Sequence, residues 1–375
     1  MKIVIALDSF KGSLSAKEAC RTVAEALASE RPDLETIEVP MADGGEGTVD
    51  ALVAACGGDY VHVNDVTGPL PEMRLTGRYG WLPEQQTAVI EMSNASGLPL
   101  LRAADRNPLR TTTYGTGQLI QHAAAGKGAR RILLALGGSA TVDGGTGAAC
   151  ACNWRFLDTA GNNLAPCGGN LYRVAKICPP DNDLLTDVDF EALCDVRNPL
   201  CGPNGAAAVY GPQKGATPEM VKALEAGLVH LGACIREELA LDVADVPGAG
   251  AAGGFGAGAL AFFGGRLVPG IEAVADTCGI NHALEGANWV VTGEGKLDNQ
   301  SLQGKVVDGV TNRARRQNVK VAAIAGRVLL SDAEGREAGI DCVVQTAPDR
   351  MSDEECLAHS REHLAQAARR LARLM

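Results

Sequence analysis

The chain opens with Lys2-Ile3-Val4-Ile5-Ala6-Leu7-Asp8, a continuous apolar run that ends at an acid. Such a run is typical of a strand that is buried on both faces of a parallel sheet. The next segment, Ser15-Ala16-Lys17-Glu18, has the sequence of a capping box, and apolar residues follow it at helical spacing. A second strand is predicted over Glu35–Met41 and a second helix over Gly47–Cys56. The beginning of the chain therefore predicts strand, helix, strand, helix.

The same pattern returns near the C-terminal end. Three strands are predicted over Asn288–Val291, Val319–Ile324 and Asp341–Val344, with a helix after Ser301. A second capping box, Ser352-Asp353-Glu354-Glu355, is expected to open the final helix. Two βα units cannot cover both faces of a parallel sheet alone, so these strands are expected to complete the sheet that the first two begin.

This arrangement predicts an α/β fold with a discontinuous first domain. Residues 1–65 and 286–375 are expected to form a doubly wound, flavodoxin-like domain with a five-stranded parallel sheet. Residues 66–285 are expected to form a second, inserted α/β domain. Its predicted strands and helices are Met73–Tyr79, Thr87–Met92, Arg131–Leu136, Phe190–Cys194, the helix Tyr114–Ala125 and a helix after Thr217-Pro218-Glu219.

Composition and charge limit the partners. The 375 residues carry a net charge of −11 and have a pI near 5.1. A chain of this charge repels polyanions, so we expect no binding to nucleic acid or to anionic membranes. The sequence contains 12 Cys but no CxxC pair, and it has no apolar stretch of the roughly 18 residues that a membrane span needs. Free thiols in this number fit a reducing compartment, so we predict a cytoplasmic protein.

Acids and lysines beside glycines follow the strands of the first domain. Ligands of an open parallel sheet bind outside the carboxyl ends of its strands, so these residues are expected to lie together. Such a group could hold Mg²⁺ and a phosphate chain, because the glycines let the backbone approach the ligand. The alternative is that each acid only caps the helix that follows it. The segments concerned are Asp8–Ser13, Asp43–Thr48, Thr292–Asp298 and Ala325–Arg327.

The inserted domain has comparable segments. Leu136-Gly137-Gly138-Ser139-Ala140-Thr141 offers N–H groups and hydroxyls without bulky side chains, which suits a phosphate or a carboxylate. Asp143–Gly147 follows it, Cys194–Leu200 places an acid at a strand end, and Tyr210–Ala216 carries a lysine. Alternatively, Asp195 forms only an Asx-turn and Lys214 is a surface charge.

Two motifs are poor guides to function. Gly248-Ala249-Gly250-Ala251-Ala252-Gly253 matches the dinucleotide fingerprint, but no buried strand precedes it, so an anion-binding loop that opens a helix is favoured. His359-Ser360-Arg361-Glu362-His363 spells a metalloprotease pattern without room for a third ligand downstream. No P-loop sequence occurs.

In the order and number of its motifs, the sequence resembles the bacterial glycerate kinase type I family. The resemblance implies ATP-dependent phosphorylation of D-glycerate, giving 2-phospho-D-glycerate and ADP, with two α/β domains around an active cleft. The residues that carry it, over nearly the whole chain, are Asp8–Gly12, Ala42–Thr48, Thr112–Gly117, Leu136–Thr141, Cys194–Leu200, Gly211–Ala216, Gly248–Gly254 and Thr292–Asp298.

Roles follow from what phosphoryl transfer needs, which is positioning and charge neutralisation. We expect Asp195 to accept the proton of the glycerate hydroxyl and Glu294 and Asp298 to hold Mg²⁺. Sequence alone leaves open which of Asp8, Asp43, Asp195 and Asp298 is the base and which binds metal. The full set of candidates comprises Asp195, Lys11, Asp8 and Asp43 for catalysis; Gly138, Ser139, Thr141, Lys214, Gly250, Gly253 and Gly293 for the nucleotide; and Asp43, Glu46, Asn198, Arg197 and Arg327 for glycerate.

Two other classes of function stay open at this point. One is a nicotinamide-dependent oxidoreductase that acts on a hydroxy-acid, and the other is a non-catalytic anion-binding protein. An absorbance assay with NAD(P)⁺ separates the first from a kinase, and glycerate-dependent release of ADP separates the second. Either O2 or O3 of glycerate is an available acceptor, and the oligomeric state is open.

Overall fold

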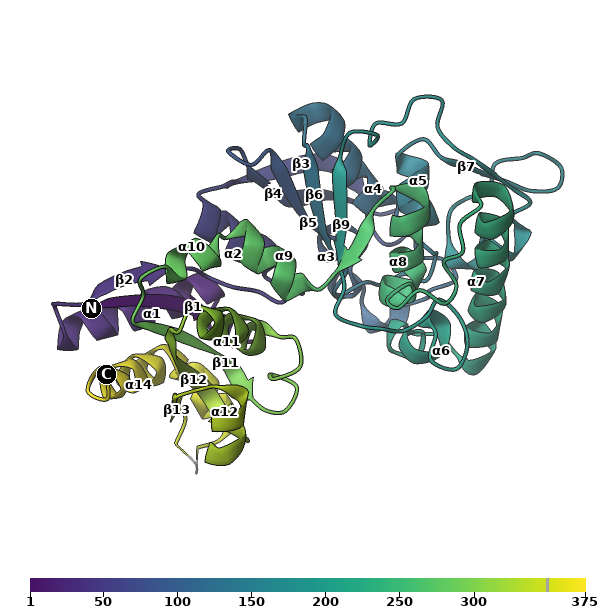
Figure 1. Ribbon diagram of the computed structural model, residues 1–375. Helices are drawn as coiled ribbons and strands as arrows, with labels where there is room; N and C mark the ends of the chain where they lie inside the picture. The colour runs from purple at the N-terminus through teal and green to yellow at the C-terminus, as the bar shows by residue number, and fades with distance from the viewer. Residues whose placement is uncertain (349–350) are drawn as a thin grey trace. The chain divides into compact units, whose positions relative to one another are not determined.

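The computed structural model describes residues 1–348 and 351–375, which form two compact units (Figure 1). The first unit comprises Met1–Asp43, Asp50–Gly58 and Pro269–Met375, and the second comprises Gly44–Val49 and Asp59–Val268. The predicted domain boundaries, after residues 65 and 285, stay a prediction. In the structure, residues 59–65 belong to the second unit and residues 269–285 to the first.

The first unit contains a five-stranded parallel sheet with the order β13-β12-β11-β1-β2. Counted along the chain within this unit, the order reads 2-1-3-4-5, which is the flavodoxin-like arrangement. The predicted α/β fold class is confirmed. The strands are β1 (Lys2–Leu7), β2 (Glu35–Glu38), β11 (Trp289–Leu297), β12 (Lys320–Val328) and β13 (Cys342–Gln345).

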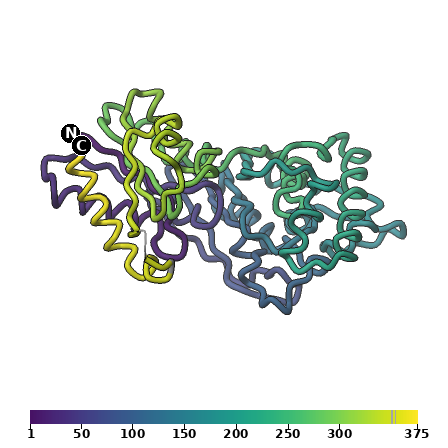
Figure 2. The backbone as a smooth tube through the Cα atoms, turned by 90° about the horizontal axis from the view of Figure 1, so that it is seen from below, coloured from purple at the N-terminus to yellow at the C-terminus, as the bar shows by residue number. Residues whose placement is uncertain are grey.

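Helices from both ends of the chain cover one face of this sheet. Ile3, Ile5 and Leu7 of β1 are fully buried and pack with apolar residues of α1 and α14. The pair α1 and α14 lies side by side in Figures 1 and 2, and Arg361–Glu18 and Arg373–Glu30 ion pairs join them. Helix α11 packs against β11 and β12. The helices are α1 (Ala16–Glu30), α2 (Thr48–Cys56), α9 (Gly270–Thr277), α10 (Ile280–Leu284), α11 (Val306–Arg316), α12 (Asp332–Ala338), α13 (Asp353–Ala358) and α14 (Ser360–Ala372).

Both predicted capping boxes are present, at Ser15 and at Ser352. Two other predictions need correction. Strands β11 and β12 extend to Leu297 and Val328 because they continue to pair as far as those residues, so most of the segments predicted as turns after them are strand. The C-terminal segment forms two helices, since His359 ends α13 and precedes α14.

The second unit contains a six-stranded mixed sheet with the order β10-β9-β6-β5-β4-β3. The strands β10, β9, β6 and β5 are parallel, whereas β4 and β3 continue the sheet antiparallel. Sequence analysis missed β3, β7, β8 and β10. The strands are β3 (Asp59–Thr67), β4 (Arg74–Leu82), β5 (Thr87–Glu91), β6 (Arg131–Ala135), β9 (Asp189–Leu193) and β10 (Arg266–Val268), with a separate pair β7 (Arg155–Leu157) and β8 (Lys176–Cys178).

Helices of this unit surround one large apolar core that includes Phe190, Phe255 and Phe262. The predicted helix over residues 114–125 is α4, followed directly by a π-helical turn over His122–Gly126. The helices are α3 (Ser93–Ser96), α4 (Tyr114–Gln121), α5 (Thr146–Ala151), α6 (Ala206–Tyr210), α7 (Pro218–Leu239) and α8 (Ala251–Phe262), with 3₁₀ turns at Leu98–Leu100, Ala103–Asp105, Gly168–Arg173 and Pro212–Lys214. Within the described residues, no helix is both long and apolar enough to span a membrane.

Helices α4 and α5 approach so closely that a side chain at Gly117 would collide with backbone. A Cβ there would lie 2.3 Å from the carbonyl oxygen of Ala148. We predict that Gly117→Ala lowers the free energy of unfolding by about 1–3 kcal/mol, because the two helices must separate. Thermal or urea unfolding measures the change.

Gly126→Ala is the matched control, since Gly126 is exposed and its added Cβ would meet only ordinary contacts, the nearest at 3.6 Å. A loss of stability as large in Gly126→Ala as in Gly117→Ala would contradict the close-packing explanation.

Candidate active site

The first unit carries a cavity of about 710 Å³ at the carboxyl ends of β1 and β11. These two strands are neighbours, with Leu7 opposite Gly293, and the order of connections reverses between them. Ligands of doubly wound sheets bind at this reversal. Five predicted site residues line the cavity, namely Asp8, Lys11, Glu294, Asp298 and Arg327.

Asp8 is the most buried acid of this cavity. Its backbone N–H donates to Gly293 O at 2.9 Å, and its Oδ1 accepts from Ser9 N at 2.6 Å. Burial, together with the negative charges of Asp43 and Glu294, raises the pKa of its carboxyl to about 7. Asp43, which is half-buried, is therefore close enough to Asp8 for the two charges to interact. Three acids in proximity, one of them at the edge of ionisation at neutral pH, create an attraction for a cation.

Glu294 faces the same cavity from β11. Its Oε1 is buried and has no hydrogen-bond partner in the described structure. Burial raises its pKa, and Ser301 and Lys305 offset part of this effect. An unpartnered carboxylate oxygen beside other acids is a suitable ligand for Mg²⁺, which prefers oxygen and needs only one or two protein carboxylates. Within residues 1–348 and 351–375, no three His, Cys, Asp or Glu side chains form a complete metal cage.

Asp298 stabilises the turn that ends β11. Its carboxylate accepts from Gln300 N at 2.9 Å and forms an ion pair with Lys296 at 3.1 Å, and these contacts lower its pKa. The side chain thus remains charged, as a metal ligand must, while it also forms the turn. Its predicted role with Mg²⁺ stays a prediction.

The cations of the cavity differ in their contacts. Lys11 is exposed, as a group that neutralises phosphate charge must be. Arg327 donates to Met351 O at 2.6 Å, so part of its guanidinium holds the backbone of a neighbouring loop. Gly293 lies inside β11, where a Cβ would come within 1.8 Å of Ile324 O. Gly293 is therefore required by the contact between β11 and β12, and its predicted contact with nucleotide stays a prediction.

In the second unit, Lys214 supports the Leu136–Thr141 segment from behind. Its ammonium donates to Ser139 Oγ and to Thr141 O, both at 2.8 Å, and only 2% of the residue is exposed. Burial lowers its pKa to about 7, and Asp143 acts in the opposite direction. Lys214 is therefore not the surface charge that one alternative assumed. It fixes the turn that exposes Gly137 and Gly138.

Asp143 completes this buried polar group. Its carboxylate accepts from Thr113 N and Thr113 Oγ1, both at 2.8 Å, and from Gly145 N and Gly147 N. Burial raises its pKa, although these donors lower it. The Asp143–Gly147 segment stands out in the sequence, but no role was predicted for Asp143 itself. Its contacts with Gly145 N and Gly147 N hold the beginning of α5.

The remaining predicted residues of the second unit lie on two loops. Asp195 and Arg197 are exposed after β9, whereas the Asn198 side chain donates to Asn204 O and accepts from Tyr210 Oη, each at 2.7 Å. Gly250 N donates to Asn198 O at 3.0 Å. A Cβ at Gly253 would lie 2.0 Å from Thr141 O.

Gly250 and Gly253 therefore lie close to protein backbone, and the interpretation that this segment is not a dinucleotide site stays a prediction. The anion-binding role predicted for Gly250 and Gly253 stays a prediction, as does the glycerate contact predicted for Asn198. Glu46 is exposed, on the segment between Asp43 and α2.

Comparison with known proteins identifies the chain. Residues 3–375 match the Glycerate kinase family. The chain belongs to the glycerate kinase family. It is 43% identical over 373 residues to a glycerate kinase of Bacillus cereus, with 99% of this chain and 97% of the relative covered. It is 41% identical over 373 residues to the glycerate 2-kinase of Escherichia coli K12, with the same two coverages. The fold agrees with the crystal structure of a candidate glycerate kinase 2 of Salmonella typhimurium LT2 at a TM-score of 0.90 and 43% identity, which covers 100% of this chain and 98% of the other.

Membership of the glycerate kinase family confirms the predicted resemblance and the prediction of an enzyme of the phosphotransferase class. It overturns the two other classes of function, the nicotinamide-dependent oxidoreductase and the non-catalytic binding protein.

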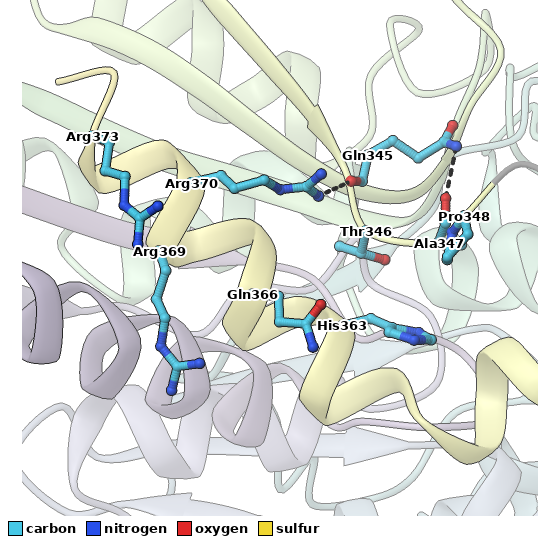
Figure 3. Close-up of a pocket in the computed structure, with 9 residues that line it drawn as sticks. All are labelled: Gln345, Thr346, Ala347, Pro348, His363, Gln366, Arg369, Arg370 and Arg373. Atoms are coloured by element: carbon cyan, nitrogen blue, oxygen red, sulfur yellow. Dashed lines mark hydrogen bonds between the residues drawn. The ribbon is translucent and has the colours of Figure 1, made fainter.

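The first unit has a second cavity, which is lined by basic side chains that do not point toward a common centre. It measures about 760 Å³ and lies between α14 and the end of β13 (Figure 3). Arg370 donates to Gln345 O at 2.7 Å and Arg373 pairs with Glu30. Figure 3 shows the guanidinium groups of Arg369, Arg370 and Arg373 separated from one another. The cavity at β1 and β11 is therefore the better candidate for phosphate chemistry.

The raised pKa of Asp8 predicts a pH-dependent stability. The folded pKa of about 7 lies above the ordinary value of 3.8, so the folded protein binds more protons between these values and loses stability as pH rises from 3.8 to about 7. In the presence of a chelator, Asp8→Asn should be more stable than the wild type at pH 8.5, on the order of 2–4 kcal/mol. At pH 5.5 the advantage of Asp8→Asn should be about half as large, because the carboxyl is then protonated only in the folded protein, and the two proteins should be nearly equal only at a pH below the ordinary value of 3.8. Urea unfolding at both pH values tests this.

Asp298→Asn is the control from the same cavity, because the pKa of Asp298 is lowered and its ionised form is already stabilised. Equal stability of Asp8→Asn and wild type at pH 8.5 would show that Asp8 is not held in a raised-pKa state.

Proposed function

We propose that this enzyme transfers the γ-phosphoryl group of ATP to O2 of D-glycerate and releases 2-phospho-D-glycerate and ADP. The observation that carries the proposal is the family match over residues 3–375, together with acids and a lysine at the point where the sheet connections reverse. The name of the Escherichia coli relative, glycerate 2-kinase, supports transfer to O2. The nucleotide is proposed from the chemistry of kinases, which position and neutralise a triphosphate.

The acids of the first cavity are proposed to hold magnesium. Glu294 and Asp298 would supply carboxylate oxygens, and Asp8 and Asp43 would add negative charge around them. When bound, the ion neutralises charge on the phosphate oxygens. Lys11, exposed at the same cavity, contributes positive charge toward the phosphate chain. These roles agree with the partial ionisation of Asp8 near neutral pH, because a nearby cation favours its charged form.

The transfer step moves one proton and one phosphoryl group. Asp195 accepts the proton of the glycerate hydroxyl as its oxygen forms a bond to the γ-phosphorus. The bond between that phosphorus and the bridging oxygen breaks, and ADP leaves with the electron pair. The Gly137–Gly138 turn, which Lys214 and Ser139 hold, supplies backbone N–H groups to an anionic group of a substrate. Arg197 and Arg327 are proposed to bind the glycerate carboxylate, which suits a guanidinium.

We also propose that the enzyme acts in the cytoplasm. All twelve cysteines have free thiols, which suits a reducing compartment. The net charge of −11 disfavours nucleic acid and anionic lipid as partners, so the partners are small molecules.

NMR of the reaction product tests substrate and position together. Incubation with D-glycerate, ATP and MgCl₂ should give a ³¹P signal coupled to the C2 proton, because O2 is the proposed acceptor. A signal coupled to the C3 protons would place the phosphate on O3. No transfer from ATP to glycerate under any divalent cation would contradict the proposed activity.

Substitution of the proposed base should reduce turnover without removing nucleotide binding. Asp195→Asn should lower kcat by about 10²–10⁴-fold, because the hydroxyl proton loses its acceptor. The Kd for ATP, measured by calorimetry, should change by less than about twofold, since the carboxylate contacts the other substrate. Asp187→Asn is the control. This exposed acid precedes β9 and lies at the end of the strand opposite Asp195. Normal kcat for Asp195→Asn would assign the base to another acid.

A further inference from the structure

A buried carboxylate of the second unit, Glu91, holds the beginning of helix α2. Glu91 is the last residue of β5 and only 6% of it is exposed. Its Oε1 accepts from Gly47 N and from Val49 N, both at 3.0 Å. Asn94 Nδ2 donates to Oε2 at 3.3 Å. The acid therefore makes contacts with a segment more than forty residues before it in sequence, as the separations of 44 and 42 residues show.

The contact replaces a cap that the local sequence does not provide. Gly47, which precedes α2, has no side chain that could accept from the first N–H groups of the helix. A carboxylate at this position satisfies those donors and interacts favourably with the positive end of the helix dipole. Hydrogen bonds to a charged acceptor are about twice as strong as neutral ones. Glu91 is thus an N-cap supplied by a different strand.

The turn that Glu91 holds, Gly44–Gly47, contains or adjoins two residues predicted to bind glycerate, Glu46 and Asp43. Gly44–Gly47 directly follows Asp43 in the chain and contains Glu46, which is exposed. Gly44 and Gly47 have φ values of 88° and 91°, a backbone conformation that other residues rarely adopt. Thr48 Oγ1 donates to Gly45 O at 2.8 Å, which closes the turn.

This turn lies against the Gly137–Gly138 turn. A Cβ at Gly137 would lie 3.3 Å from Gly45 Cα, so the two backbones are in direct proximity. A Cβ at Gly138 would lie 3.2 Å from Ser93 Cβ, so the first turn after Glu91 is also close to it. The exposed Gly137–Gly138 turn therefore lies close both to the Gly44–Gly47 turn and to Ser93, and Glu91 fixes the position of the Gly44–Gly47 turn.

We propose that Glu91 is a positioning residue for the hydroxy-acid acceptor. By holding Gly47 and Val49, it keeps Glu46 and the Gly45 backbone beside the Gly137–Gly138 turn, where a small carboxylate with neighbouring hydroxyls is bound. Glu91 itself does not contact the acceptor, because its oxygens are occupied by backbone and Asn94 donors. The proposal rests on the proposed glycerate kinase activity.

Glu191 provides a matched control. It is also a buried glutamate of the same sheet, with 3% exposed, but it lies in β9 and pairs with Arg131 and Arg266. Neither of these arginines belongs to a glycine turn, so the removal of Glu191 should reduce stability without changing substrate recognition.

Steady-state kinetics of Glu91→Gln and Glu91→Ala provide the first test, at a temperature where both remain folded. The KM for glycerate should rise about threefold or more in Glu91→Gln and about tenfold or more in Glu91→Ala, because a charge-assisted contact is first weakened and then lost. The KM for ATP should stay within about twofold of the wild type. Glu191→Gln should leave both constants unchanged. Equal effects on the two substrates, or a change in stability alone, would overturn the positioning role.

Amide hydrogen exchange separates a failure of this proposal from a failure of the proposed function. In Glu91→Gln, the amides of Gly47 and Val49 should exchange faster than in the wild type, whereas Glu191→Gln should leave them unchanged. Faster exchange in an enzyme that does not phosphorylate glycerate would retain the capping contact and overturn only the identity of the acceptor. Unchanged exchange in Glu91→Gln would overturn the capping contact itself.

Discussion

The parallel pairing of β1 with β11 is the contact on which the first unit depends. It joins a strand from the N-terminal end of the chain to one from the C-terminal end, with Ile3 opposite Trp289 and Leu7 opposite Gly293. This register places Asp8 and Glu294 at the same edge of the sheet. The connections of the sheet also reverse there, so the strand edges leave a cavity instead of being covered by a helix. The position of the acids is therefore a consequence of strand pairing and not of a local motif.

Acids are retained at this edge although their burial is unfavourable. Asp8 is held near ionisation at neutral pH, and Glu294 has a buried oxygen without a partner. Such groups reduce stability in the free protein, and the proposed binding of a cation and a phosphate chain would offset this cost. In the second unit, by contrast, three buried charged side chains have hydrogen-bond partners. Asp143, Lys214 and Glu91 are buried but hydrogen-bonded, and each holds a backbone turn. One unit thus exposes reactive side chains in a cavity, while the other uses buried side chains to shape its loops.

Much of the fold could be predicted from the sequence because parallel strands that are buried on both faces have continuous apolar sequences. Lys2–Leu7 is such a run, and the two capping boxes mark helices reliably since the reciprocal hydrogen bonds are local. By contrast, β3 has alternating exposed residues at a sheet edge, which read as a loop. The length of β11 was underestimated because glycines at residues 293 and 295 suggested a turn, whereas they allow a close approach of β12 and of the Asp8 loop.

The site was predicted only in part, for a related reason. Asp8 and Glu294 could be predicted because each is an acid that follows an apolar run and has glycines nearby. Glu91 also follows an apolar run, but it was not predicted because no glycine stands beside it. Lys214 is recognisable in the sequence as the lysine of the Tyr210–Ala216 segment, but its burial depends on residues from a distant turn, which no local pattern reveals.

The assembly of one unit from both ends of the chain has a consequence for biosynthesis. When β1, α1 and β2 leave the ribosome, the strand that must lie beside β1 has not yet been translated. The second unit is translated before β11 and has its own core. It can therefore fold while β1 still lacks the strand that pairs with it. The apolar Lys2–Leu7 segment therefore has no β11 to pair with for most of the synthesis time.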